Sequence, residues 1–162
     1  MENMSEKVEI LKEYAEYAFN RFERTIEGLA EQELDWKPME ESNNMRWILN
    51  HLSRIVNVYA MMYIRGEPDY VPEGWPEDYA EKSHELDKLL GDIEKGKKAM
   101  LNGLDGLSSA DLKTDITRRG TSRSRQEGLF GMLSEVISHN GQIAYLRGTI
   151  KRHREKDPKF LK

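Results

Sequence analysis

Three side chains of the kinds that bind divalent metals occur at spacings that could bring them together. Glu135 and His139 are four residues apart, so on a helix they lie on the same side, one turn apart. His51 follows Ile48 by three residues and precedes Ile55 by four, so it points toward the same interior as these apolar neighbours. One carboxylate and two imidazoles suit Zn, Ni, Fe or Mn, and three protein ligands leave positions open for water or substrate. If a metal is bound, such a site is of the open, catalytic kind, although spacing and composition alone favour the plainer interpretations that follow.

Plainer interpretations of the same residues stay open. His51 could be a hydrogen-bonded histidine at the edge of the core. Glu135 and His139 could form an ion pair along one exposed helix edge, because Glu-x-x-x-His is a weak signal by itself. If Glu135 is buried, however, its charge must be paired, neutralised or bound to a cation, because burying a lone charge is costly.

Four long helices are predicted to position these residues, separated by loops rich in Pro, Gly, Asp and Ser. Each carries apolar residues at intervals of three and four. The predicted ranges are Ser5 to Leu29, Ser42 or Asn43 to Arg65, Ser83 to Leu104, and Arg125 or Gln126 to His153. No stretch alternates long enough to predict a strand, so the expected fold is all-α, a single four-helix bundle domain over residues 1–162.

Two features of the helices and their connections bear on the site. The second helix is expected to turn Trp47 inward with Ile48 and Leu52, and to end at Gly66. The following residues, 66–79, contain three prolines and two glycines, which exclude a helix or a central strand. A packed surface loop is favoured for this segment, and a lid over a cavity is the alternative.

Other polar residues have weaker claims to function. Four arginines precede the fourth helix: Arg118, Arg119, Arg123 and Arg125. They could form an anion-binding rim, although an ordinary polar loop is favoured. His84 and His153 are expected on the surface. Gly141 is interpreted as a point of close approach by another helix, and Gln142 either as a support for a metal ligand or as an exposed polar residue.

Composition excludes several classes of protein. The 162 residues include no cysteine, which removes disulfides, thiolate metal sites and cysteine nucleophiles. A net charge of −4 disfavours nucleic acid as a partner. No apolar run approaches the roughly 20 residues of a membrane span, and the polar, acidic start does not suggest a signal peptide. A cytoplasmic protein that binds neither nucleic acid nor membrane is expected.

Several motifs together resemble the DinB-like family. They are the Leu34-x-Trp36-x-Pro38 connector, Asn50-His51-Leu52, and Glu135-x-x-x-His139-x-Gly141-Gln142-Ile143 followed by Leu146-Arg147. The resemblance covers most of the chain and implies a four-helix bundle, in many members dimeric. Where the family has three metal-ligand histidines, His51 and His139 match two, and Glu135 stands at the third. The metal is either retained by this carboxylate or lost, and retention is favoured because glutamate is itself a ligand.

The function that the resemblance implies is that of a divalent-metal-dependent enzyme. Metal-activated water or a thiol would act on a small molecule, which makes the chain a hydrolase or a thiol-dependent transferase. A low-molecular-weight thiol and a second copy of the chain are the expected partners. The alternative is a non-catalytic, stress-related dimeric helical protein. A DNA-associated role, suggested only by the family's name, is disfavoured by the net charge.

Overall fold

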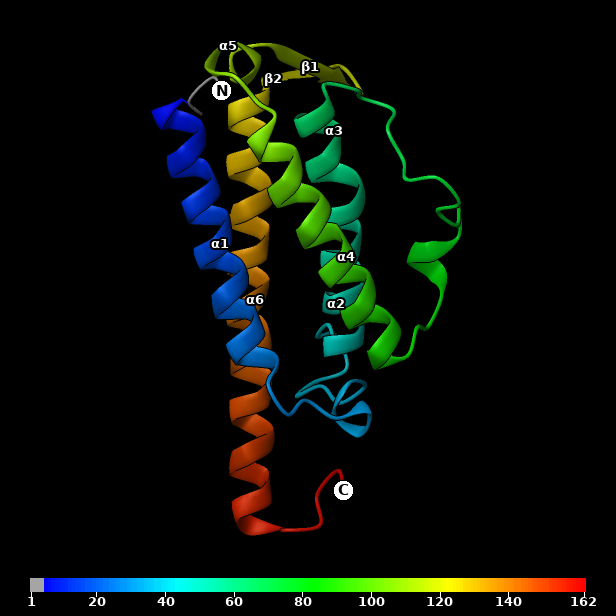
Figure 1. Cartoon of the computed structure of the whole chain (residues 1–162). Helices are drawn as coiled ribbons and strands as arrows, with labels where there is room; N and C mark the ends of the chain where they lie inside the picture. The colour runs from blue at the N-terminus through cyan, green and yellow to red at the C-terminus, as the bar shows by residue number, and fades with distance from the viewer. Residues whose placement is uncertain (1–4) are drawn as a thin grey trace.

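The structure, a computed structural model, describes residues 5–162, which fold mainly into helices (Figure 1). Four long helical segments lie side by side, and a π-helical turn divides the second of them. The bounds in chain order are α1 Glu6–Ile26, a 3-10 turn Glu31–Glu33, α2 Met45–Arg54, the π-helical turn Ile55–Tyr59, α3 Ala60–Arg65, a 3-10 turn Tyr79–Glu81, α4 Leu86–Asp105, α5 Ser109–Leu112, β1 Asp115–Arg118, β2 Thr121–Ser124 and α6 Arg125–Lys156.

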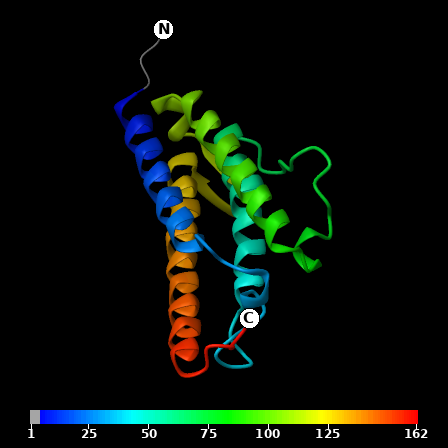
Figure 2. The same ribbon diagram turned by 60° about the horizontal axis from the view of Figure 1, so that its bottom comes forward.

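The core lies between the four segments and is built from their apolar stripes. α1 lies against α6, and α4 packs against both α1 and the α2–α3 segment (Figures 1 and 2). The stripe of α1 is buried as its spacing predicts: Val8, Leu11, Ala15, Ala18, Phe19 and Phe22. Burying one large apolar side chain of this stripe contributes about 2 kcal/mol to the stability of the folded state. Within residues 5–162, none of the helices combines the length and the apolar character needed to cross a membrane.

The second helical segment begins and ends at recognisable signals. The Asn44 side chain accepts a hydrogen bond from the backbone N–H of Trp47 (2.9 Å), so α2 begins at Met45, slightly later than predicted. Gly66 adopts a left-handed conformation with φ of 72°, which ends α3 after Arg65 as predicted. The single second helix that the sequence predicts therefore corresponds to α2, the π-helical turn and α3 together.

That irregularity is the π-helical turn, and it packs closely against α4. The Asn57 side-chain amide donates to the backbone carbonyls of Ser53 (2.9 Å) and Asp92 (2.8 Å), which ties the turn to α4. On the α4 side, a Cβ atom added to Gly96 would lie 2.5 Å from Val56 Cγ2. Gly96 lowers the helix propensity of α4, but the close approach requires it.

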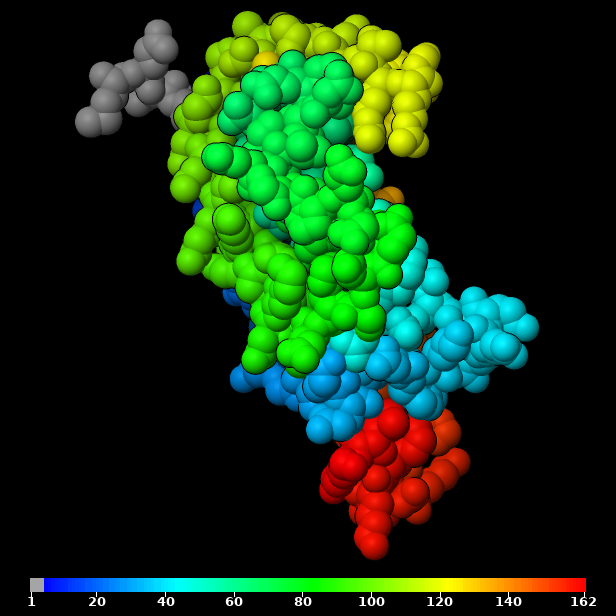
Figure 3. All heavy atoms as spheres, turned by 90° about the vertical axis from the view of Figure 1, so that its right-hand side faces the viewer, coloured from blue at the N-terminus to red at the C-terminus, as the bar shows by residue number. Residues whose placement is uncertain are grey.

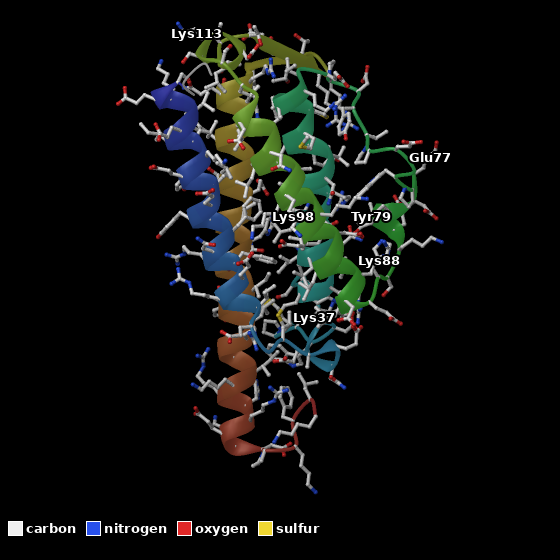
Figure 4. All side chains as sticks on the ribbon, in the orientation of Figure 1. Lys37, Glu77, Tyr79, Lys88, Lys98 and Lys113 are labelled. Atoms are coloured by element: carbon white, nitrogen blue, oxygen red, sulfur yellow. The ribbon has the colours of Figure 1, made fainter. Side chains whose placement is uncertain are left out.

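The loop after α3 is packed onto the helices, as the favoured interpretation has it (Figures 3 and 4). Tyr79 is 1% exposed, its hydroxyl donates to Asp92 Oδ2 (2.7 Å) and lies 2.8 Å from Ser53 Oγ. Trp75 stacks on the Tyr79 ring, and burial raises the pKa of the Tyr79 hydroxyl. Ser53 comes two residues after His51, so this anchor lies on the opposite side of α2 from His51.

A small β-hairpin, which the all-α prediction leaves out, joins α5 to α6. β1 and β2 pair antiparallel with Asp115 opposite Ser124. Arg119 and Gly120 connect them with φ of 50° and 78°. Two positive φ angles are typical of a two-residue hairpin turn, for which Asn-Gly is the usual signal. Arg-Gly lacks that signal, which is why the hairpin was missed.

The four arginines predicted as a possible rim have different environments. Arg125 is 8% exposed, and its guanidinium donates to the backbone carbonyls of Tyr63 (Nε, 2.6 Å) and Ile64 at the end of α3. Its role is therefore structural. Arg118 lies over the ring of Tyr59, whereas the other two arginines are exposed on the hairpin.

Arg46 joins the start of α2 to the connector before it and to the start of α4. Its side chain is 14% exposed and donates to both carboxylate oxygens of Asp35 (2.7 and 2.8 Å) and to the His84 carbonyl (2.6 Å). It also lies 2.7 Å from Glu31 Oε1. The hydrogen bond from Arg46 lowers the pKa of Asp35, and the N–H of Leu86, with help from Arg46, lowers that of Glu31.

Replacing Arg46 should lower the free energy of unfolding and should also make that free energy depend less on pH in the acid range. Arg46→Met is expected to lower the free energy of unfolding at pH 7 by about 1–3 kcal/mol, because it removes charge-assisted hydrogen bonds. The pKa values of Glu31 and Asp35 are lower in the folded state. Their contribution is therefore present above the ordinary values and lost as the pH falls from about 5 to about 3. Urea unfolding at these pH values, with exposed Arg123→Met as control, measures both effects. An acid loss as large in Arg46→Met as in the wild type would contradict the assignment.

Candidate metal centre

Two neighbouring helices bring three potential metal ligands to one point. His51 lies on α2, and Glu135 and His139 lie on α6. Glu135 Oε2 is 3.2 Å from His51 Nε2 and 3.0 Å from His139 Nε2. One ligand atom from each residue can be chosen such that all three lie within 4.8 Å of one another. The structure thus brings together the three residues that the sequence predicts.

The cluster lies at the edge of the core, closed on one side and open on the other. The His139 side chain is 11% exposed and the His51 side chain 22%, whereas that of Glu135 is 42% exposed. Val136, next to Glu135, is buried in the core. The imidazoles are therefore held by packing, while the carboxylate reaches solvent, from which an ion or a small molecule can approach.

The protonation of His51 suits metal binding. Burial lowers the pKa of His51 below its ordinary value of 6.5, and the hydrogen bond with Glu135 opposes this shift without cancelling it. His51 is therefore neutral at pH 7 and can offer a nitrogen lone pair. A metal ligand must be unprotonated in this way.

Gln142 orients the second imidazole. Its Oε1 atom lies 2.9 Å from His139 Nδ1, so the amide oxygen accepts the Nδ1 proton and directs Nε2 toward Glu135. Nε2 then presents a lone pair to a carboxylate oxygen 3.0 Å away, a contact that needs a proton or a cation between the two atoms. The donor set therefore fits a divalent ion. Gln142 is also exposed, so it combines the two interpretations: it contacts a candidate ligand, and it is an exposed polar residue.

Trp47 is part of the site, and its predicted position was wrong. An inward position was expected for Trp47, but 43% of this residue is exposed. Its ring stacks on that of His51, with 5.2 Å between ring centroids, and lies edge-on to that of His139 at 6.2 Å. The signal that could have found it is its position one turn before His51 on the same helix face.

Three other predicted positions lie outside the cluster. His84 Nε2 is 3.0 Å from the carbonyl oxygen of Tyr79, and His153 stacks on Phe160. The close helix approach expected at Gly141 is absent, because a Cβ atom added there would meet nothing within 4 Å.

Comparison with known proteins identifies the fold and the family of the chain. A crystal structure described as that of the conserved protein of a locus from Enterococcus faecalis is similar, with a TM-score of 0.64 and 19% sequence identity. The match covers 86% of this chain and 94% of that one, and at this identity it shows a shared fold only. No curated protein matches the sequence. The family model described as DinB superfamily matches residues 14–143, which is most of the chain. The chain therefore belongs to the DinB superfamily.

Proposed function

We propose that His51, Glu135 and His139 bind a divalent metal, one of Zn, Ni, Fe or Mn, and that the chain is a metal-dependent enzyme acting on a small molecule. The observation that carries the proposal is the meeting of two imidazole nitrogens and one carboxylate oxygen within 4.8 Å. When bound, the ion would supply Lewis acidity, which polarises a substrate group and acidifies water or a thiol.

The protein's own residues have distinct tasks in this proposal. Glu135 contributes the negative charge that the family's third histidine would lack. Gln142 holds the tautomer of His139 that presents Nε2. Trp47 covers one side of His51 and excludes water from that face. We propose a hydrolase or a thiol-dependent transferase, with a low-molecular-weight thiol as one reactant in the second case.

A non-catalytic role has one observation in its favour. The contacts from Glu135 to His51 and His139 form an ion-pair and hydrogen-bond cluster that needs protons only, with no metal. A stress-related dimeric helical protein would use the cluster only to hold α2 against α6. The two functions differ in metal content.

Further parts of the proposal concern the whole chain. We class the fold as a four-helix bundle and treat the chain as one domain, with the hairpin as an addition. A homodimer is also proposed, and burial of exposed apolar side chains such as Ile10, Tyr14 and Phe130 would favour it. A cytoplasmic location, and the expectation of neither nucleic-acid nor membrane binding, remain predictions.

Metal content separates the two functions. Protein purified without chelators or metal-affinity columns is expected to contain about one metal ion per site by elemental analysis. Added metal at about 100 times its Kd should stabilise the fold by about 2.7 kcal/mol. His51→Ala and His139→Ala should lose both the metal and the stabilisation, whereas His153→Ala, far from the cluster, should retain them.

Glu135→Gln sharpens this test, because it keeps the shape of the side chain and removes its charge. We expect it to bind metal much more weakly than the wild type. Wild-type protein that contains no metal, and whose melting temperature does not respond to Zn, Ni, Fe or Mn, would overturn the metal proposal and favour the non-catalytic one.

Trp47 provides an optical report of metal binding. Paramagnetic Mn²⁺ or Ni²⁺ held beside its ring should quench its fluorescence. Trp36, beside Phe160, and Trp75, on Tyr79, pack elsewhere. A titration of wild type is expected to show saturable quenching that Trp47→Phe lacks while still binding metal. Quenching of equal size in Trp47→Phe would show that the ion binds elsewhere.

A further inference from the structure

A cavity of about 480 Å³ lies beside the candidate metal centre. The connector before α2, the start of α2 and the middle of α6 form its walls, and it is open to solvent on one side. None of the three proposed ligands lines it, but its wall includes Ser138, which precedes His139, and Gln142, which holds the His139 ring. Gln142 is therefore the direct link between the cavity and the cluster.

The cavity wall carries no formal charge. Its polar side chains are the hydroxyls and amides of Ser42, Asn43, Ser138 and Gln142. The remaining wall includes Ile48 and Leu146, which are buried, and Tyr145, which is 62% exposed. A charged ligand would give up water here without gaining an ionic partner, so the wall favours a neutral molecule with an apolar or aromatic body.

The NH₂ group of Gln142 indicates which polar group a ligand in this cavity should carry. Its oxygen accepts from His139 Nδ1, and among the described residues no hydrogen bond employs its NH₂ group. An exposed NH₂ group at a cavity wall is a donor that a carbonyl oxygen can accept. A ligand placed in this way would lie one side chain away from His139.

We propose that this cavity binds the neutral, carbonyl-bearing body of the substrate, with its carbonyl oxygen accepting a hydrogen bond from the Gln142 NH₂ group. The role as a substrate site rests on the metal-dependent function proposed above. Binding in the cavity itself does not require the metal, so the two can be tested separately.

Gly141 allows the cavity to be filled without touching the metal ligands. It lines the cavity, is exposed, and has open space where a side chain would begin. Methionine is a better helix former than glycine, so Gly141→Met should fold and place its side chain in the cavity. Gly131 is also within α6 with open space at its Cβ position and is not part of the cavity wall, which makes Gly131→Met the matched control.

The experiment titrates chelator-treated, metal-free protein with benzamide, benzoate and benzylamine, which have similar size and different charge. Two-dimensional ¹H–¹⁵N NMR follows the Gln142 side-chain amide and the Gly141 backbone amide. Benzamide should shift both signals, with benzoate and benzylamine binding at least about tenfold more weakly. Gly141→Met should weaken benzamide binding at least about tenfold, and Gly131→Met should leave it unchanged.

Three results would overturn the inference: no shift of the Gln142 side chain, equal binding of the charged probes, or wild-type binding by Gly141→Met. Elemental analysis of wild-type protein purified without chelators separates a failure of the cavity assignment from a failure of the metal proposal. Normal metal content without benzamide binding in the wild type would refute the cavity assignment alone. Benzamide binding as expected in a protein that never takes up metal would support the cavity as a binding site and remove the metal proposal.

Discussion

A carboxylate between two imidazole nitrogens is the constraint on which this site depends. Glu135 Oε2 lies 3.2 and 3.0 Å from the Nε2 atoms of His51 and His139, and these contacts are stable only with protons or a cation between the atoms. The two histidines meet only because α2 lies against α6. Arg46 holds one end of the α2–α3 segment and Arg125 the other, so these interactions also help to fix the geometry of the cluster.

Much of the fold and the three residues of the cluster could be predicted because both depend on local spacing. Helical periodicity places Glu135 and His139 on one side of a helix, and Gly66 ends the preceding segment as expected. The π-helical turn could not be predicted from local spacing, because its close packing involves Gly96 on a distant helix. Trp47 was misplaced for a related reason: an apolar residue type predicts burial, but here the ring rests on a polar cluster.

Gln142 shows how one uncharged side chain can serve two neighbouring environments. Its carbonyl oxygen fixes the imidazole of His139, and this leaves its NH₂ group as a donor to whatever occupies the adjoining cavity. A ligand bound there would polarise the amide and, through it, the hydrogen bond to the ring. Sequence spacing could suggest that Gln142 contacts His139. It could not suggest the role at the cavity, because the connector and α6, which are distant in the sequence, form the cavity walls together.

The π-helical turn has a consequence for how the chain tolerates changes in length. It adds one residue to a helix of otherwise regular pitch, and each residue turns a helix by about 100°. The wide turn absorbs this residue, so deleting one residue between Ile55 and Tyr59 would restore regular winding and leave α3 facing about as it does now. Deleting one residue from the regular part of α3 ahead of Tyr63 would instead turn the residues after it by about 100°. Ile64 would then leave its contact position opposite Gly103, and Tyr63 its position opposite Gly128. We therefore expect the π-helical turn to accept the loss of one residue more readily than the regular helix beside it.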